Sequence, residues 1–320
     1  MQELQFASHL PSTDLSASMI ICWQRGIAWI LERLDLFRPA DPTSPDQLKE
    51  IAELSLLYGH VLPWVAEEYQ GKLAPIGQFL CEFLGKDLTL AHWVRRAPSQ
   101  YNPYIVAYLP LRSIGVRLPA FEEAVSALHS AGYPEALENT PYREMELQYL
   151  TWKAGVGRSR PNWGRLYQST VMRRGGNPIY FSIHDVYSVT HTLLYLTDVC
   201  GPRTDMPATE RQRAIKIVES LLVHYWRKPD WDITCELLIN LVALSHYETP
   251  LFTAALNAVA NVWRRDGALP GPHFSEKHVK SDQKLLFRDC YHTTLVGLIL
   301  CAAYLHRSVW GGGSSGDASA

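Results

Sequence analysis

Apolar residues recur at helical spacing along most of the chain, and proline or glycine interrupts the pattern at intervals. The strict alternation of apolar and polar positions that would predict strands is almost absent. We therefore expect an all-α protein of about twelve helices. By residue number, the predicted helices span 14–37, 45–64, 73–96, 103–118, 119–130, 141–155, 163–174, 182–199, 209–226, 232–247, 249–265 and 285–306.

Five of these helices contain the same short pattern, in which Glu or His precedes a run of mostly apolar residues. The residues that open the pattern are Glu53, Glu146, His191, Glu236 and His292. The spacing is 45 residues from Glu146 to His191 and again from His191 to Glu236. It is 93 residues from Glu53 to Glu146, and 56 residues from Glu236 to His292, which fits one period plus a loop insertion. A constant spacing of this length is typical of repeated helical hairpins.

All five residues fall on the second helix of a predicted pair, and Tyr104 occupies the corresponding position on the remaining pair. We therefore predict an (α/α)6-type toroid of six hairpins, in which the second helices form an inner barrel. These helices are apolar nearly all round, as expected for helices that are buried on both sides. Residues 1–310 are expected to form this single domain, and residues 311–320 a flexible Gly/Ser tail.

The repeated polar residues would form one ring inside the barrel, with Glu146 and Glu236 as the nearest neighbours of His191. A buried carboxylate or imidazole is unfavourable unless it is paired, hydrogen-bonded or bound to a metal. His191, Glu236 and His292 lie on three consecutive inner helices, and two His with one carboxylate is a ligand set of non-haem iron and of zinc. The first hypothesis is therefore a divalent transition metal, iron or zinc, on these three residues.

A second hypothesis is acid–base chemistry without a metal. A desolvated carboxyl group has a raised pKa and can donate a proton near neutral pH, while a nearby His accepts one. The candidate catalytic residues are Glu53, Glu146, Tyr187, Asp185 and Asp232. For Asp185, Asp232 and Asp289, a carboxylate at the start of a helix is the commoner explanation.

A third hypothesis is a purely structural network, in which Lys49 and Arg143 neutralise the ring carboxylates and fix helix packing. Asp289, three residues before His292, is expected to orient that imidazole. Residues 266–284 form the longest predicted loop, which is expected over one end of the barrel, where it can act as a lid.

Composition narrows the class of protein. The hydrophobic share of 47% supports a large core, and a formal charge of -2 gives no electrostatic signature of nucleic-acid binding. We found no long uninterrupted apolar run and no signal-peptide pattern at the N-terminus, so neither a membrane span nor secretion is expected. The six cysteines are isolated from one another, as in a cytoplasmic protein with reduced thiols. Phosphate-binding and dinucleotide motifs are missing, so no nucleotide cofactor is expected.

The six helix pairs with an inner polar ring resemble the α/α-toroid superfamily, which includes terpenoid cyclases, protein prenyltransferase β subunits and lanthionine-synthetase cyclases. Thr190-His191 with Tyr195 and Asp198, and the loop 266–270, are similar to an uncharacterised group of bacterial helical proteins associated with specialised metabolism. The acidic D-x-D-D motif of terpenoid cyclases is absent, and the Cys-Cys-His zinc set of lanthionine cyclases has no match. The residues of this chain therefore give no basis for assigning it the activity of terpenoid cyclases or of lanthionine cyclases.

The sequence thus favours a biosynthetic enzyme that acts on a small, largely apolar molecule inside the toroid, as a cyclase, a lyase or an oxygenase. Metal-assisted chemistry through His191, Glu236 and His292 is the leading version, and metal-free acid–base chemistry is the alternative. A helical-repeat binding or scaffold protein is the hypothesis from a different class. The binding or scaffold hypothesis predicts that ion pairs within the protein neutralise every charged residue of the ring.

Overall fold

The computed structural model describes residues 12–41, 45–85, 87–156, 160–201, 206–228 and 230–310. This part of the chain consists of helices, turns and loops and contains no β-strand, so the all-α prediction is confirmed. The predicted Gly/Ser tail, 311–320, lies outside the described residues.

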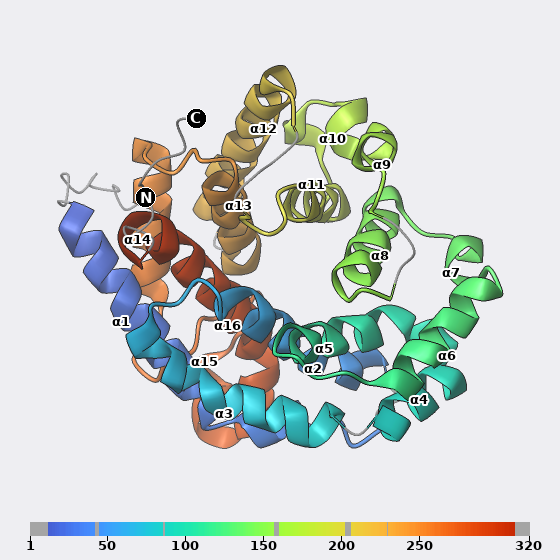
Figure 1. The fold of residues 1–320 in the computed structure, drawn as a ribbon. Helices are drawn as coiled ribbons and strands as arrows, with labels where there is room; N and C mark the ends of the chain where they lie inside the picture. Colours follow the sequence, from blue (N-terminus) through green and yellow to red (C-terminus); the bar gives the residue numbers. More distant parts are fainter. Residues whose placement is uncertain are drawn as a thin grey trace, which may run out of the picture.

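Six helices contact one another in a closed cycle (Figure 1). In cyclic order, each helix packs on the next and the last packs on the first. They are α2 (Pro45–Val61), α5 (Tyr101–Ser113), α8 (Pro141–Lys153), α11 (Ile183–Leu196), α13 (Trp231–Ala243) and α16 (Gln283–Leu305). These are the helices that the sequence pattern assigns to the inner layer. The wider likeness to the α/α-toroid superfamily stays a prediction.

Other helices lie along the outside of this cycle (Figure 1). Among their contacts, α1 packs on α16, α3 on α2 and α5, α9 on α8, α10 on α11, and both α12 and α14 on α13. Their bounds are α1 (Ser12–Leu31), α3 (Glu67–Leu84), α4 (Asp87–Arg96), α6 (Pro119–Ser130), α9 (Trp163–Ser169), α10 (Val171–Arg174), α12 (Ala208–Arg227) and α14 (Pro250–Val262). Short elements are η1 (Leu34–Phe37), η2 (Pro98–Gln100), α7 (Tyr133–Ala136), η3 (Pro178–Tyr180), α15 (Glu276–Ser281) and η4 (His306–Trp310).

Several predicted helix ends are wrong, always where a local turn interrupts the apolar pattern. The first helix ends at Leu31, and the expected continuation is the separate 3-10 turn η1. The seventh divides at Thr170 into α9 and α10. The tenth ends at Ala243, four residues early, with Ser245 in the left-handed region at φ 51°. The predicted helix 73–96 divides at Gly85 into α3 and α4.

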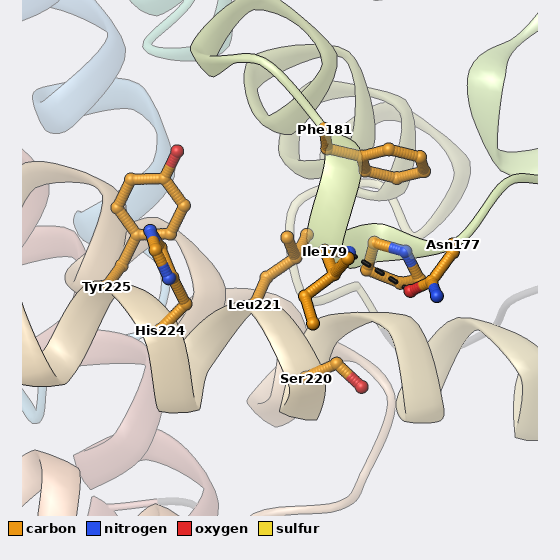
Figure 2. A pocket seen from close by; sticks show the side chains of 8 residues that line it. Asn177, Ile179, Phe181, Ser220, Leu221, His224 and Tyr225 are labelled. Atoms are coloured by element: carbon orange, nitrogen blue, oxygen red, sulfur yellow. Dashed lines mark hydrogen bonds between the residues drawn. The ribbon is translucent and has the colours of Figure 1, made fainter.

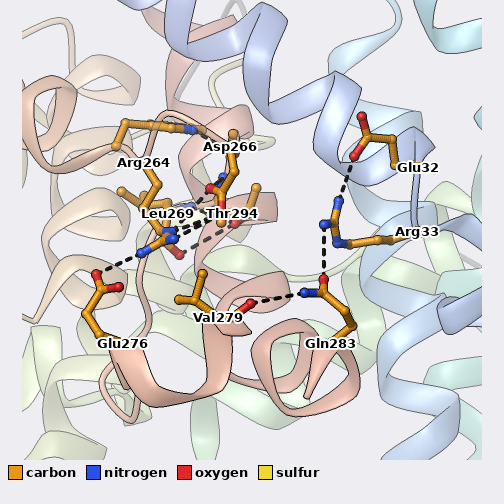
Figure 3. Close-up of polar contacts among 12 residues, drawn as sticks. Glu32, Arg33, Arg264, Asp266, Leu269, Glu276, Val279, Gln283 and Thr294 are labelled. Atoms are coloured by element: carbon orange, nitrogen blue, oxygen red, sulfur yellow. Dashed lines mark hydrogen bonds and ion pairs between the residues drawn. The ribbon is translucent and has the colours of Figure 1, made fainter. Parts of the chain in front are cut away.

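The loop after α14 is fixed at its start. Arg264 binds Asp266 and Glu276 at 3.1 and 2.9 Å, and the backbone N–H of Leu269 donates to Thr294 on α16 at 2.9 Å (Figure 3). Gly267 adopts φ +98°, and a Cβ at this position would collide with the backbone of α1. Residues 266–271 are therefore a packed connection.

The inner helices form the core. All residues of α13 from Asp232 to Ala243 are buried. The segment Gln283–Trp310, which is α16 with η4, is long and apolar enough to span a membrane, which the sequence analysis did not expect. In the fold, 72% of its most apolar window is buried against other helices, as in the core helix of a helical ring.

Candidate functional site

Asp232 and Glu236 on α13 meet His292 on α16 at the inner side of the ring. One ligand atom from each residue lies within 4.8 Å of the others. The two carboxylates are four residues apart, which places them on one face of α13, and α13 and α16 are neighbours in the cycle. Asp232 and Glu236 are buried, whereas the His292 side chain is 31% exposed, so solvent reaches this group of three residues.

Each of the three side chains is held by a second polar group. His292 donates from Nδ1 to Oε2 of Glu53 at 2.9 Å. The Tyr187 hydroxyl donates to Oδ2 of Asp232 at 3.0 Å, and the Thr190 hydroxyl donates to Oε2 of Glu236 at 2.5 Å. Nε2 of His292 and Oδ1 of Asp232 take no part in these contacts and lie 3.2 Å apart. Outer partners of this kind orient the ligands of metal sites in proteins.

One of the remaining oxygens has no hydrogen-bond partner. Oδ1 of Asp232 lies 3.2 Å from Nε2 of His292, but the two atoms are not aligned for a hydrogen bond. The oxygen is buried and has no other partner in the described part of the chain. An unsatisfied buried carboxylate oxygen is unfavourable, so this atom favours a cation close to it.

The charges of the three groups depend on one another. Burial raises the pKa of Glu236, and the charge of Asp232 raises it further. Burial acts in the same direction on Asp232, but His292 outweighs it and the pKa of Asp232 is lowered. Burial opposes protonation of His292, yet Glu53 and Asp232 raise its pKa well above the ordinary value. His292 is thus the principal positive partner of Asp232, whereas His191 lowers the pKa of Glu236 more than His292 does.

His191 is not part of this group, so the predicted ligand set is wrong in one member, and Asp232 takes its place. Nδ1 of His191 lies 2.9 Å from the carbonyl oxygen of Tyr187, one turn earlier on α11, and 3.9 Å from Glu236. Because a carbonyl oxygen only accepts, Nδ1 carries a proton, and Nε2 is the ring nitrogen that can take up another. The imidazole ring lies among Tyr142, Tyr187 and Tyr195, at centroid distances of 5.7, 5.9 and 6.3 Å.

Glu146 belongs to a separate network. Its carboxylate accepts from Arg143 at 2.6 Å and from the Tyr195 hydroxyl at 2.6 Å. The structural hypothesis fits this carboxylate, whose two oxygens are both bonded. Of the two neighbours predicted for His191, Glu236 lies 3.9 Å from its ring. Glu146 does not contact His191 directly but bonds to Tyr195, whose ring lies beside that of His191.

Asp185 and Asp232 differ although both are close to the start of a helix. Asp185 forms a capping box with Ser182 at the beginning of α11, as the helix-start explanation predicts. The cap of α13 is Asp230, whose side chain accepts from the N–H of Ile233. Asp232 lies in the first turn of α13, as the helix-start explanation predicts, and because Asp230 is the cap its carboxylate also faces the site.

Two further details were not predicted correctly. Asp289 binds His278 at 2.6 Å, so Glu53, and not Asp289, orients His292. The sequence analysis did not assign a role to Thr190. Its only signal is a polar residue immediately before His191 on an apolar helix.

A pocket of about 210 Å³ lies elsewhere, between η3 and α12 (Figure 2). It contains none of the ring residues. The side chain of Asn177 accepts from the N–H of Ile179 at 3.2 Å and shapes the turn that forms one wall. Its lining is Asn177, Pro178, Ile179, Phe181, Ser220, Leu221, His224 and Tyr225.

Comparison with known proteins gives a family without an assigned activity. No curated protein and no solved structure matches the chain. Residues 23–302 match the model of one family, and this range contains all eight candidate site residues named from the sequence. The chain therefore belongs to the family described as Domain of unknown function (DUF6895).

Proposed function

We propose that this protein is a metal-dependent biosynthetic enzyme that acts on a small molecule at the inner side of the helical ring. Asp232, Glu236 and His292 would hold a divalent transition metal such as iron or zinc. The observation that supports this is the convergence of three ligand atoms within 4.8 Å, each on a side chain whose other polar atom is already bonded.

The charge of the site fits a divalent cation. Two carboxylates and a neutral imidazole have a charge of -2, which one divalent ion balances, and burial of unbalanced carboxylates is strongly unfavourable. Oxygen and imidazole ligands together suit first-row metals such as iron and zinc. Three protein ligands leave coordination positions open, which is typical of catalytic and not of structural sites.

A bound metal of this kind supplies a Lewis acid that polarises a substrate oxygen. The chain itself supplies the orientation. Glu53 holds the His292 ring by its Nδ1–H, and Tyr187 fixes the rotamer of Asp232. His191 presents an acceptor nitrogen beside the site, where it can take a proton from a substrate that lies against the three tyrosine rings.

The test is the metal content of the full-length protein, purified without chelator and then supplied in turn with Fe(II) and Zn(II). We expect about one equivalent bound in the wild type, and less than about a tenth of an equivalent in Asp232→Asn and His292→Ala. Glu146→Gln is the matched control, because it removes a buried carboxylate of the same ring and should keep the metal. A wild-type protein that binds neither ion would refute the proposal.

A metal-free acid–base enzyme is the second candidate function. The observation that favours it is that both ring nitrogens of His292 face carboxylates, Glu53 at 2.9 Å and Asp232 at 3.2 Å, as in a bound imidazolium. The same measurement separates the two candidates. Turnover of a substrate by protein that has been freed of metal would favour this second candidate.

A further inference from the structure

The inner faces of three ring helices become apolar beyond the candidate metal site. Leu56 follows Lys49 on α2, Leu194 follows Tyr187 on α11, and Ile299 follows His292 on α16, each after seven residues. Seven residues are about two helical turns, so each apolar residue lies on the same stripe of its helix as the polar residue before it.

These apolar side chains keep partial exposure although their sequence neighbours do not. Leu56, Leu194 and Ile299 are partly exposed, while the adjacent Leu57, Leu193 and Leu298 are completely buried. The outer sides of the same helices are covered, with α3 on α2, α10 on α11 and α1 on α16. The exposure therefore follows the stripe of Lys49 on α2, of Tyr187 on α11 and of His292 on α16, on the side of each helix that is turned away from the outer helices.

A second polar cluster marks one end of the apolar zone, which consists of Leu56, Leu194 and Ile299. Asp198 accepts from the Tyr149 hydroxyl at 2.8 Å and pairs with Lys153 at 2.7 Å. Asp198 lies seven residues after His191, which corresponds to about 10 Å along a helix. The apolar zone thus has a polar end at the candidate metal site and another at Asp198.

The backbone at Asp198, which belongs to this cluster, is strained. Asp198, Val199 and Cys200 have φ of 50, 47 and 64°, a run of left-handed residues without glycine. This conformation is unfavourable for L-residues, and most of all for β-branched Val199. Bonds from Arg307 to the carbonyl oxygens of Cys200 and Gly201 hold the segment in place. Strain of this kind is concentrated at functional positions.

We propose that the substrate is an amphipathic small molecule with a metal-binding polar head and a hydrocarbon chain. The head lies at Asp232, Glu236 and His292, and the chain runs along Leu56, Leu194 and Ile299 toward Asp198. This inference rests on the proposed metal site. It adds the chemical class of the substrate and the direction in which it lies.

The test uses alkyl hydroxamates, whose head binds metals and whose tail length can be varied. The dissociation constants of acetohydroxamate, butanohydroxamate, hexanohydroxamate, octanohydroxamate and dodecanohydroxamate are measured by calorimetry on the zinc-loaded full-length protein. We expect binding to become about fourfold tighter with each added methylene. The gain should stop once the tail reaches the polar cluster of Tyr149, Lys153 and Asp198.

Two variants locate the tail, Ile299→Thr and Leu56→Asn. Each should leave acetohydroxamate binding unchanged and reduce the gain per methylene to about twofold or less. Ile179→Thr is the matched control, because Ile179 is 78% exposed on the outside of the ring. The melting temperature of each variant is measured to verify that it is folded.

The outcomes separate the inference from the proposed function. If neither zinc nor any hydroxamate binds, the metal site itself is refuted. If acetohydroxamate binds but longer tails give no gain, the metal site stands and the amphipathic substrate is refuted. A gain that persists in both Ile299→Thr and Leu56→Asn, or in metal-free His292→Ala, also overturns the inference, because the tail then lies elsewhere.

Discussion

Glu146 and Glu236 occupy equivalent positions of the repeat, two periods of 45 residues apart, yet their surroundings differ. Glu146 has a cation three residues before it, Arg143, and a tyrosine hydroxyl on its other oxygen. Glu236 has Ile233 at the corresponding place, and instead of an arginine it has the imidazole of His191, 3.9 Å away. The comparison shows that one repeated carboxylate can complete a structural network while another is left in need of a cation.

The physical basis of the difference is charge balance within a buried layer. A carboxylate paired with an arginine on its own helix keeps its charge without help from elsewhere. Glu236 instead has Asp232 one turn before it, and this second negative charge adds to the effect of burial in raising the Glu236 pKa. A divalent cation between the two carboxylates would offset both effects.

The largest expected effect is on metal affinity. Glu236→Gln should weaken zinc binding by at least about 100-fold, because the loss of a ligand exceeds the 10- to 100-fold effect of losing an outer partner. Glu146→Gln should leave the zinc affinity unchanged. Competition with a chromophoric chelator measures both, and equal losses in the two variants would remove the distinction between the two glutamates.

Replacing a side chain that orients a metal ligand should weaken zinc binding less than replacing the ligand itself. Thr190→Val keeps the shape of the side chain but removes the hydroxyl on Glu236, and it should weaken zinc binding about tenfold. Thr197→Val is its control, because Thr197 is also buried at the end of α11 but donates to the backbone of Leu193. An unchanged zinc affinity in Thr190→Val would show that this hydroxyl has no role in orienting Glu236.

The Glu146 network should affect stability and not metal binding. Arg143→Met leaves a mostly buried carboxylate without its cation and should lower the free energy of unfolding by about 1–3 kcal/mol. Lys49→Met is the control, because Lys49 is 57% exposed and 3.7 Å from Glu53, and should lower it by less than about 0.5 kcal/mol. Urea denaturation measures both values. A larger loss in Lys49→Met would contradict the comparison.

The smallest expected effect is on the pH dependence of stability, through His60. This residue lies on α2 seven residues, or about two helical turns, after Glu53. Its pKa is shifted in the opposite direction from that of His292. Burial lowers the pKa of His60 to about 4, and the Asp198 charge only partly opposes this. A lowered histidine pKa means that the unfolded chain binds more protons below its own pKa of about 6.5, so stability falls as the pH falls toward 4. Between pH 7 and pH 6 the loss should not exceed about 0.7 kcal/mol.

His60→Gln removes this titration and is the variant that tests it. The difference in free energy of unfolding between wild type and His60→Gln should favour the wild type less at pH 6 than at pH 7. A difference that is independent of pH would mean that His60 has the same pKa in the folded and unfolded protein.

The candidate site was predictable only in part. The ring position of Glu236 and His292, and the roles of Lys49 and Arg143 as partners, follow from helical spacing and from charges three or four residues apart. The presence of Asp232 in the candidate metal site, in place of His191, does not follow from helical spacing. It depends on the His191 ring turning toward the Tyr187 carbonyl and on Asp230 forming the cap of α13. These are choices of rotamer and helix start that the residue types permit but do not require.

The sequence by itself determined the all-α class, the alternation of inner and outer helices, and the layer of polar residues at a 45-residue spacing. It could do so because helical periodicity and proline or glycine breaks are local properties of the chain. Only the tertiary structure decided which polar residues converge. Side chains from α2, α11, α13 and α16, which follow one another in the cycle, meet at the site. Their partners are set by distances and orientations between segments that are far apart in the sequence.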